Sequence, residues 1–139
     1  MNDGKILLPR NLVQQMFHQA QASPDSEVCG LISAIGGSVS RCYPVANVAG
    51  DPAHLFDMDA AGQVRALREI RERGETLFAI YHSHPYAPPE PSARDRALTA
   101  YPEAYHLIVS LNTKGVLELR AWKPVAGGMT EVPVKIIPD

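Results

Sequence analysis

Two histidines, His82 and His84, flank a single serine at the end of an apolar run, in the segment YHSHP from 81 to 85. If this run is a β-strand, residues two apart point to the same face, so the two imidazoles project side by side. Each could bind one metal ion through a ring nitrogen at about 2.0–2.1 Å. An isolated His-x-His is equally compatible with two polar residues at a strand edge, so a metal site requires further ligands.

A carboxylate follows this pair across a loop that contains four prolines between positions 85 and 91. Proline restricts φ and lowers the entropy lost when a loop is held in one shape, so the loop could return Asp95 to the histidines. Two histidines and one carboxylate leave a fourth tetrahedral position for water, which is typical of a catalytic zinc site. Ser92 and Asp95 also form a Ser-x-x-Asp helix-capping pattern, and the capping and metal-binding roles are compatible.

A water activated by zinc has a pKa of about 7 and needs a nearby carboxylate that takes its proton and passes it to the leaving amine. Glu27 is the candidate, because it begins an otherwise apolar strand in SEVCGLIS. A charge at that place needs either a function or an exposed position. The alternative is an exposed glutamate at the start of a strand.

Together these residues resemble the JAMM family, also called MPN+ or Mov34/PAD-1 metallopeptidases. The match consists of Glu27 in EVCGLI, then HSHP from 82 to 85, then seven residues after His84 and Ser-x-x-Asp from 92 to 95. The resemblance implies that one zinc ion is bound by three ligands: His82, His84 and Asp95. It also implies Glu27 as the general acid and base, Ser92 as the hydroxyl that stabilises the tetrahedral oxyanion, and Ser83 as a hydrogen-bonding support that does not touch the metal.

The same resemblance implies hydrolysis of a peptide or isopeptide bond at the C-terminal Gly-Gly of a ubiquitin-like protein. The chain has no long insertion, so it is similar to the compact prokaryotic members, some of which remove cysteine or another adduct from a ubiquitin-like sulfur-carrier protein. The identity of the carrier, the choice between peptide and isopeptide bonds, and the oligomeric state stay open at this point.

Two other functions are compatible with parts of the pattern. One is a non-catalytic MPN-type scaffold that binds a ubiquitin-like tail, which the intact Glu27 and Asp95 argue against. The other is a zinc deaminase, whose His-x-Glu and Pro-Cys-x-x-Cys signatures do not occur in this sequence.

The composition agrees with one globular domain over residues 1–139: 45% of the residues are hydrophobic, 20% are charged, and the formal net charge is −2. No basic block favours nucleic acid, no run of about 18 apolar residues predicts a membrane span, and the N-terminus lacks a signal-peptide layout. We therefore expect a cytoplasmic protein with no nucleic-acid or membrane partner. Two cysteines, Cys29 and Cys42, are expected to be reduced packing residues, although a redox role is left open.

The elements that must position the site are predicted from periodicity and turn signals. Helices are expected at 9–22, after 59 and at 92–101, and strands at 27–35, 38–48, 54–59, 76–84, 104–111, 116–122 and 130–137. The order predicts an α/β (α+β) fold with a single mixed, largely antiparallel sheet flanked by helices, and the resemblance implies the JAMM/MPN (cytidine-deaminase-like) architecture.

Individual residues carry further expectations. The first helix should have Pro9 in its first turn, and the second should have Asp57 or Asp59 as its cap and Gly74 as its stop. An apolar stripe on the second helix should comprise Val64, Leu67 and Ile70. The remaining expectations are a hairpin turn at Gly36-Gly37, an edge position for the strand containing Pro133, a core or edge position for His106, and surface positions for His18 and His54.

Overall fold

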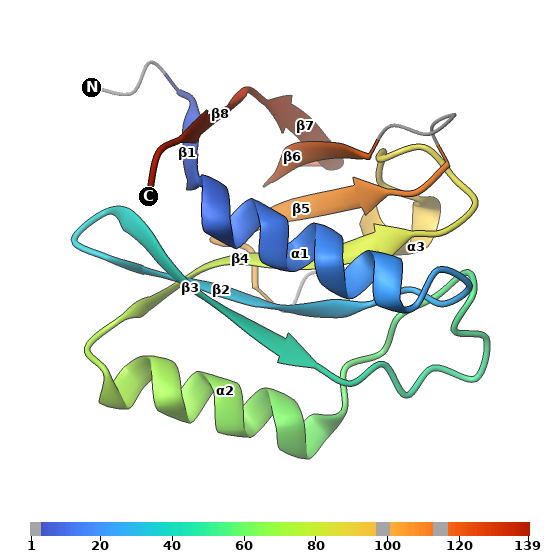
Figure 1. The fold of residues 1–139 in the computed structure, drawn as a ribbon, viewed down its shortest axis with the longest axis horizontal. Helices are drawn as coiled ribbons and strands as arrows, with labels where there is room; N and C mark the ends of the chain where they lie inside the picture. The colour runs from blue at the N-terminus through green and yellow to red at the C-terminus, as the bar shows by residue number, and fades with distance from the viewer. Residues whose placement is uncertain (1–3, 97–100, 113–116) are drawn as a thin grey trace.

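The computed structural model describes residues 4–96, 101–112 and 117–139, and its chain order is shown in Figure 1. No helix within these ranges is both long and apolar enough to cross a membrane. The elements, in chain order, are β1 (Ile6–Pro9), α1 (Arg10–Ala22), β2 (Cys29–Ile35), β3 (Ser38–Val45), α2 (Ala60–Glu72), β4 (Thr76–His84), α3 (Ala93–Arg96), β5 (Tyr105–Ser110), β6 (Glu118–Val125), β7 (Gly128–Val132) and β8 (Val134–Ile137).

Six strands form the main sheet in the order β3-β2-β4-β5-β6-β7. The β4–β5 pair is parallel and the other neighbouring pairs are antiparallel, which confirms the predicted mixed, largely antiparallel sheet. The expectation of a single sheet is wrong in one respect, because β1 and β8 form a separate two-stranded parallel sheet. The sequence does not predict β1, since its four residues are too few to show a period.

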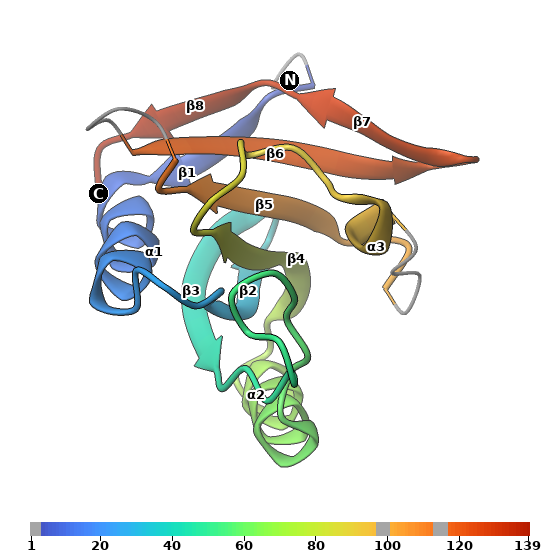
Figure 2. The ribbon, with the colours of Figure 1, turned by 90° about the vertical axis from the view of Figure 1, so that its right-hand side faces the viewer.

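The main sheet is covered on both faces, as Figure 2 shows, with α1 on one side and α2 and α3 on the other. Residues two apart on a strand share a face, so β4 divides its side chains between two cores. Ala79 and Tyr81 pack with α1, whereas Ile80 packs with α2. His82 and His84 continue the face of Ile80, so the candidate site lies on the α2 and α3 side, at the end of β4.

Local signals explain the elements around the site. Gly36 and Gly37 have φ values of 55° and 84°, as a tight hairpin turn between β2 and β3 requires. Asp59 caps α2 by accepting a hydrogen bond from the Gly62 amide at 2.9 Å, so the second of the two predicted caps is the correct one. Gly74 has a φ of 72° just after α2 and confirms the predicted stop. Pro9 lies one residue before α1, as its cap, and not in its first turn.

Two expectations about the segment between β3 and β4 are corrected. The segment 54–59 is not a strand, since it makes only an isolated bridge between Met58 and Asn47. Val64 is 54% exposed, which contradicts its place in the predicted apolar stripe. The buried residues of α2 are Ala66 and Ile70, because they lie on the helix face that packs against the sheet and Val64 does not.

The predicted last strand is divided at Pro133, which cannot donate to a ladder and separates β7 from β8. Of the helix expected over 92–101, the structure describes Ser92, α3 and Tyr101, and 97–100 lie outside the described residues.

Candidate metal centre and active site

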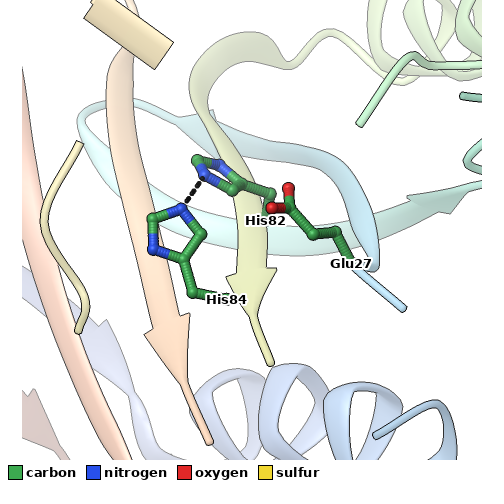
Figure 3. Close-up of side chains that lie close together, drawn as sticks. All are labelled: Glu27, His82 and His84. Carbon is green, nitrogen blue, oxygen red and sulfur yellow. Dashed lines mark hydrogen bonds between the residues drawn. The ribbon is translucent and has the colours of Figure 1, made fainter. Parts of the chain in front are cut away.

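The end of β4 brings the two predicted imidazoles together in the interior. His82 is 0% exposed and His84 is 4% exposed, because β4 is a central strand between β2 and β5. Their Nε2 atoms face one another at 3.1 Å, as Figure 3 shows. Two buried imidazole nitrogens at this distance form a ready pair of metal ligands.

Asp95 completes a triangle with this pair. Its Oδ2 atom lies 3.2 Å from Nε2 of His82 and 3.2 Å from Nε2 of His84. The predicted capping pattern is also present, since the Asp95 amide donates to Ser92 Oγ at 3.1 Å and the Ser92 amide donates to Asp95 Oδ2 at 2.9 Å. The cap therefore fixes the carboxylate in the position from which it reaches the histidines.

The spacing of these three atoms fits a zinc ion. Tetrahedral ligands at 2.0–2.1 Å from zinc are separated from one another by about 3.3 Å, and the observed separations are 3.1, 3.2 and 3.2 Å. Two imidazoles and one carboxylate form a donor set that suits zinc and leaves a coordination position for a water or a substrate oxygen.

The two histidines are oriented by different contacts. Nδ1 of His84 lies 2.8 Å from the Pro88 carbonyl oxygen, a contact that fixes the tautomer and directs Nε2 toward the triangle. Nδ1 of His82 has no hydrogen-bond partner among the described residues. Its ring is instead stacked on Phe56, with centroids 4.5 Å apart and an interplanar angle of 23°. Packing against Phe56 thus orients the His82 ring, whereas a hydrogen bond orients the His84 ring.

Glu27 reaches this triangle from the segment before β2 (Figure 3). It is 5% exposed, and its carboxylate lies within 4.8 Å of the ligating nitrogens of His82 and His84. Its Oε1 atom has no hydrogen-bond partner among the described residues. Of the two possibilities left open for Glu27, the exposed glutamate at a strand start is therefore wrong, and the carboxylate faces the imidazoles from the interior.

Burial controls the charge of Glu27. Desolvation raises its pKa from 4.5 to about 7, although the charge of His84 lowers it and that of Asp95 raises it further. A carboxylate with a pKa near neutrality exchanges protons readily at physiological pH, which is the property required of a general acid and base.

The charges of the three triangle residues favour a bound cation. Burial opposes ionisation of Asp95, but hydrogen bonds with His82 and His84 outweigh it and hold the pKa of this carboxyl well below its usual range. Burial lowers the pKa of His82, whereas at His84 the contacts with Asp95 and the Pro88 carbonyl outweigh burial and raise the pKa. An ionised carboxylate in a buried place needs a cation beside it, and a metal ion can take the place of a proton there.

The two serines of the motif make different contacts near the site. Ser83 Oγ accepts a hydrogen bond from the Val28 amide at 2.9 Å, which ties the segment of Glu27 to the strand of the histidines. Ser92 is exposed at the mouth of the site. Its oxygen accepts the Asp95 amide, so its O–H remains able to donate to a substrate oxygen.

Two pockets lie beside the site: the lining of one includes His84, and the lining of the other includes Phe56, which stacks on His82. A cleft of about 330 Å³ is lined by Glu27, His84 and Ser92, together with Ala53, His54, Pro85, Tyr86 and Ala87. A pocket of about 230 Å³ is lined by Phe56, Met58, Ile80 and His106, together with Asp57, Gln63, Arg94 and Tyr101. A larger groove of about 710 Å³ along β3 contains none of the predicted site residues in its lining.

All five predicted site residues are therefore near one another: Glu27, His82, His84, Ser92 and Asp95. His106 is buried, as expected of a core histidine, and burial lowers its pKa to about 4. His18 and His54 are exposed, also as expected.

Two contributors to the site, Phe56 and Asn47, are not among the residues that the sequence indicates. Phe56 lies in the segment 54–59 expected to be a strand, and its neighbours Leu55 and Met58 are also apolar, so nothing local singles it out. Asn47 had been read as part of the return strand, and nothing in its neighbours distinguishes it from an ordinary residue at a strand end.

Comparison with known proteins gives three consistent results. The chain is 29% identical over 134 residues to the CysO-cysteine peptidase of Mycobacterium tuberculosis, covering 95% of this chain and 91% of the relative. It is 36% identical over 93 residues to the desampylase of Haloferax volcanii, covering 66% of this chain and 67% of the relative. A solution structure of a protein from Desulfitobacterium hafniense superposes with a TM-score of 0.82 and 31% identity, covering 96% of this chain and 94% of that one.

A family model described as prokaryotic homologs of the JAB domain matches residues 9–125, which is most of the chain. Because this match includes every residue of the triangle, Glu27 and Ser92, the chain belongs to the Prok-JAB family.

Proposed function

We propose that this chain is a zinc-dependent peptidase that hydrolyses the amide bond at the C-terminus of a ubiquitin-like, sulfur-carrier type of protein. Two relatives support this substrate class by their names, one a CysO-cysteine peptidase and the other a desampylase. The cytosol is the proposed compartment, in keeping with the two unpaired cysteines.

One observation carries the proposal: a buried carboxylate with a pKa of about 7, Glu27, lies beside three potential ligands whose spacing fits zinc. A structural zinc site is closed by four protein ligands. Here three atoms lie 3.1–3.2 Å from one another, and Oε1 of Glu27 makes no hydrogen bond to any described residue. That arrangement favours catalysis over a purely structural role.

His82, His84 and Asp95 would hold the metal, which when bound supplies a Lewis acid that makes water a nucleophile near neutral pH. Glu27 takes one proton from the water that attacks the carbonyl carbon. As the C–N bond breaks, Glu27 gives that proton to the nitrogen, so the products are a carboxylic acid and a free amine. The Ser92 hydroxyl donates to the carbonyl oxygen while negative charge develops on it.

The lining of the two pockets indicates how the substrate lies. The leaving nitrogen must be close to Glu27 to receive its proton, and Glu27 lines the cleft of about 330 Å³. The leaving group therefore occupies that cleft. The acyl half of the substrate extends past His82 toward the second pocket, whose walls combine apolar side chains with polar and charged ones. The apolar residues include Phe56, Met58 and Ile80, and the polar ones include Asp57, Gln63 and Arg94.

The test is hydrolysis of a defined pair of conjugates. One is a ubiquitin-like carrier of the host extended by a single cysteine at its C-terminus, and the other is the same carrier joined to a lysine side chain. The zinc-loaded protein should release cysteine or the lysine-bearing product, as read by mass spectrometry. The activity should stop with a chelator and return with zinc.

Glu27→Gln is the diagnostic variant, because it keeps the shape of the side chain and removes its basicity. It should bind zinc as the parent does and lose turnover. A variant that hydrolyses at the parental rate would overturn the assignment of the base, and protein that binds and releases the carrier unchanged with zinc present would favour a scaffold.

A further inference from the structure

Asn47 organises the segment between β3 and α2 with its side chain. Its Nδ2 donates to the Glu27 carbonyl oxygen at 2.9 Å and to the Leu55 carbonyl oxygen at 3.0 Å. Its Oδ1 accepts from the amides of Ala49 at 3.0 Å and Asp57 at 2.9 Å. All four hydrogen-bonding positions of the amide are thereby used, and each goes to the main chain.

Glu27 depends on this same segment for its backbone contacts. Its amide donates to the Pro52 carbonyl oxygen at 2.6 Å, and its carbonyl oxygen accepts from Asn47. The sheet does not hold Glu27 directly, since β2 begins at Cys29. The last tie to β4 is at Val28, through Ser83. Both main-chain polar groups of Glu27 are therefore bound by the loop and neither by a neighbouring strand.

We propose that Asn47 is a positioning residue for Glu27, a role that rests on the proposed function of this glutamate as the base. The side chain of Glu27 receives no hydrogen bond at Oε1 from any described residue, so its direction is set by its backbone and by packing. The backbone is in turn set by the Asn47 amide. A base must be within hydrogen-bond reach of the proton that it takes, and a displacement of about 1 Å can lower the rate by about 10²-fold.

The hydrogen bonds of Asn47 require an amide side chain, which an aspartate cannot replace. Aspartate has the same shape and would still accept from Ala49 and Asp57, but it cannot donate. Its second oxygen would face the carbonyl oxygens of Glu27 and Leu55 at about the 2.9–3.0 Å now occupied by hydrogen bonds. Asn47→Asp thus removes the hydrogen bonds to the carbonyl oxygens of Glu27 and Leu55 and keeps those from the amides of Ala49 and Asp57.

The experiment compares four zinc-loaded proteins: the parent, Asn47→Asp, Glu27→Gln and the double variant. The substrate is the carrier extended by one cysteine, and each protein is also titrated with zinc against a chromophoric chelator. We expect Asn47→Asp to bind zinc with an affinity within about threefold of the parent, since none of the three ligands contacts Asn47. We expect its kcat to fall by about 10²-fold with little change in KM.

The double variant separates positioning from a general structural effect. If Asn47 acts through Glu27, the double variant should turn over no more slowly than Glu27→Gln alone, because residues that act as a unit are not additive. The inference would be overturned if Asn47→Asp lowered kcat in the Glu27→Gln background by the same factor as in the parent. Loss of zinc binding by Asn47→Asp, or a kcat within threefold of the parent, would overturn it as well.

Val48→Ala provides the matched control. Val48 is the residue that follows Asn47, and it is 56% exposed, so its truncation should leave kcat and zinc affinity unchanged. If Glu27→Gln itself keeps parental turnover, the proposed base is wrong. If Glu27→Gln loses turnover and Asn47→Asp does not, only the positioning role is wrong.

Discussion

Replacing Glu27 by glutamine tests how much stability the fold loses by burying this carboxylate. The residue is 5% exposed, and its pKa is about 7 in the metal-free folded protein against an ordinary value of 4.5. A raised pKa means that the folded state disfavours the charged form. The stability contributed by the neutral carboxyl is therefore complete below pH 4.5 and is lost as the pH rises through about 7.

The magnitude follows from the two pKa values. A difference of one unit in pKa corresponds to about 1.4 kcal/mol. The rise in the pKa of Glu27 from 4.5 to about 7 therefore lowers the free energy of unfolding by about 3 kcal/mol once Glu27 is ionised. Glutamine carries no charge at any of these pH values. We therefore expect Glu27→Gln to raise the free energy of unfolding by up to about 3 kcal/mol at pH 8 and by about 1 kcal/mol or less at pH 5.

The measurement is urea unfolding of chelator-treated protein at pH 5, 6, 7 and 8, followed by the fluorescence of the single tryptophan, Trp122. Glu72→Gln is the control, because Glu72 is exposed on α2 and its replacement should have no pH-dependent effect. A stability difference between Glu27→Gln and the parent that is the same at pH 5 and pH 8 would refute the reasoning.

The remaining predictions concern the metal, the oxyanion and the packing under the site. His82→Ala should lower the zinc content, measured by atomic absorption, from about one per chain to near zero, and full occupancy would contradict the triangle. Ser92→Ala should keep zinc and lower kcat by about 10²–10³-fold, whereas an unchanged kcat would remove the hydroxyl from the mechanism. Gly30→Ala should destabilise the fold by about 1–3 kcal/mol in urea, because its Cβ would lie 2.5 Å from the Tyr43 carbonyl oxygen and 2.6 Å from the Tyr81 ring. Parental stability of that variant would show that β2 and β3 can separate, and that the Tyr81 ring can shift, to admit a methyl group.

Several elements of the fold could be predicted because their signals are local. The hairpin at Gly36-Gly37 and the end of α2 at Gly74 each follow from a glycine at a positive φ. The strand β4 followed from its continuous apolar run, and the pairing of His82 with His84 on one face followed from the period of a strand.

Other elements depended on contacts distant in sequence. β1 pairs with β8 from the opposite end of the chain, and the four residues of β1 are too few to show a pattern of their own. The segment 54–59 alternates like a strand yet has no neighbouring strand to extend its pairing beyond one bridge. Its conformation is decided by the Asn47 side chain, a contact that no period in the sequence expresses.

The sequence by itself determined which groups could act on a substrate, because the spacing of His82, His84, Ser92 and Asp95 is set within one strand, one stiff loop and one helix cap. Only the tertiary structure decided that Glu27 would meet them. Its approach depends on β2 pairing with β4, on the Ser83 contact across 55 residues, and on the loop that holds its backbone. Burial by that packing also raises the pKa of Glu27 to about 7, since desolvation comes from surrounding atoms and not from the residue itself.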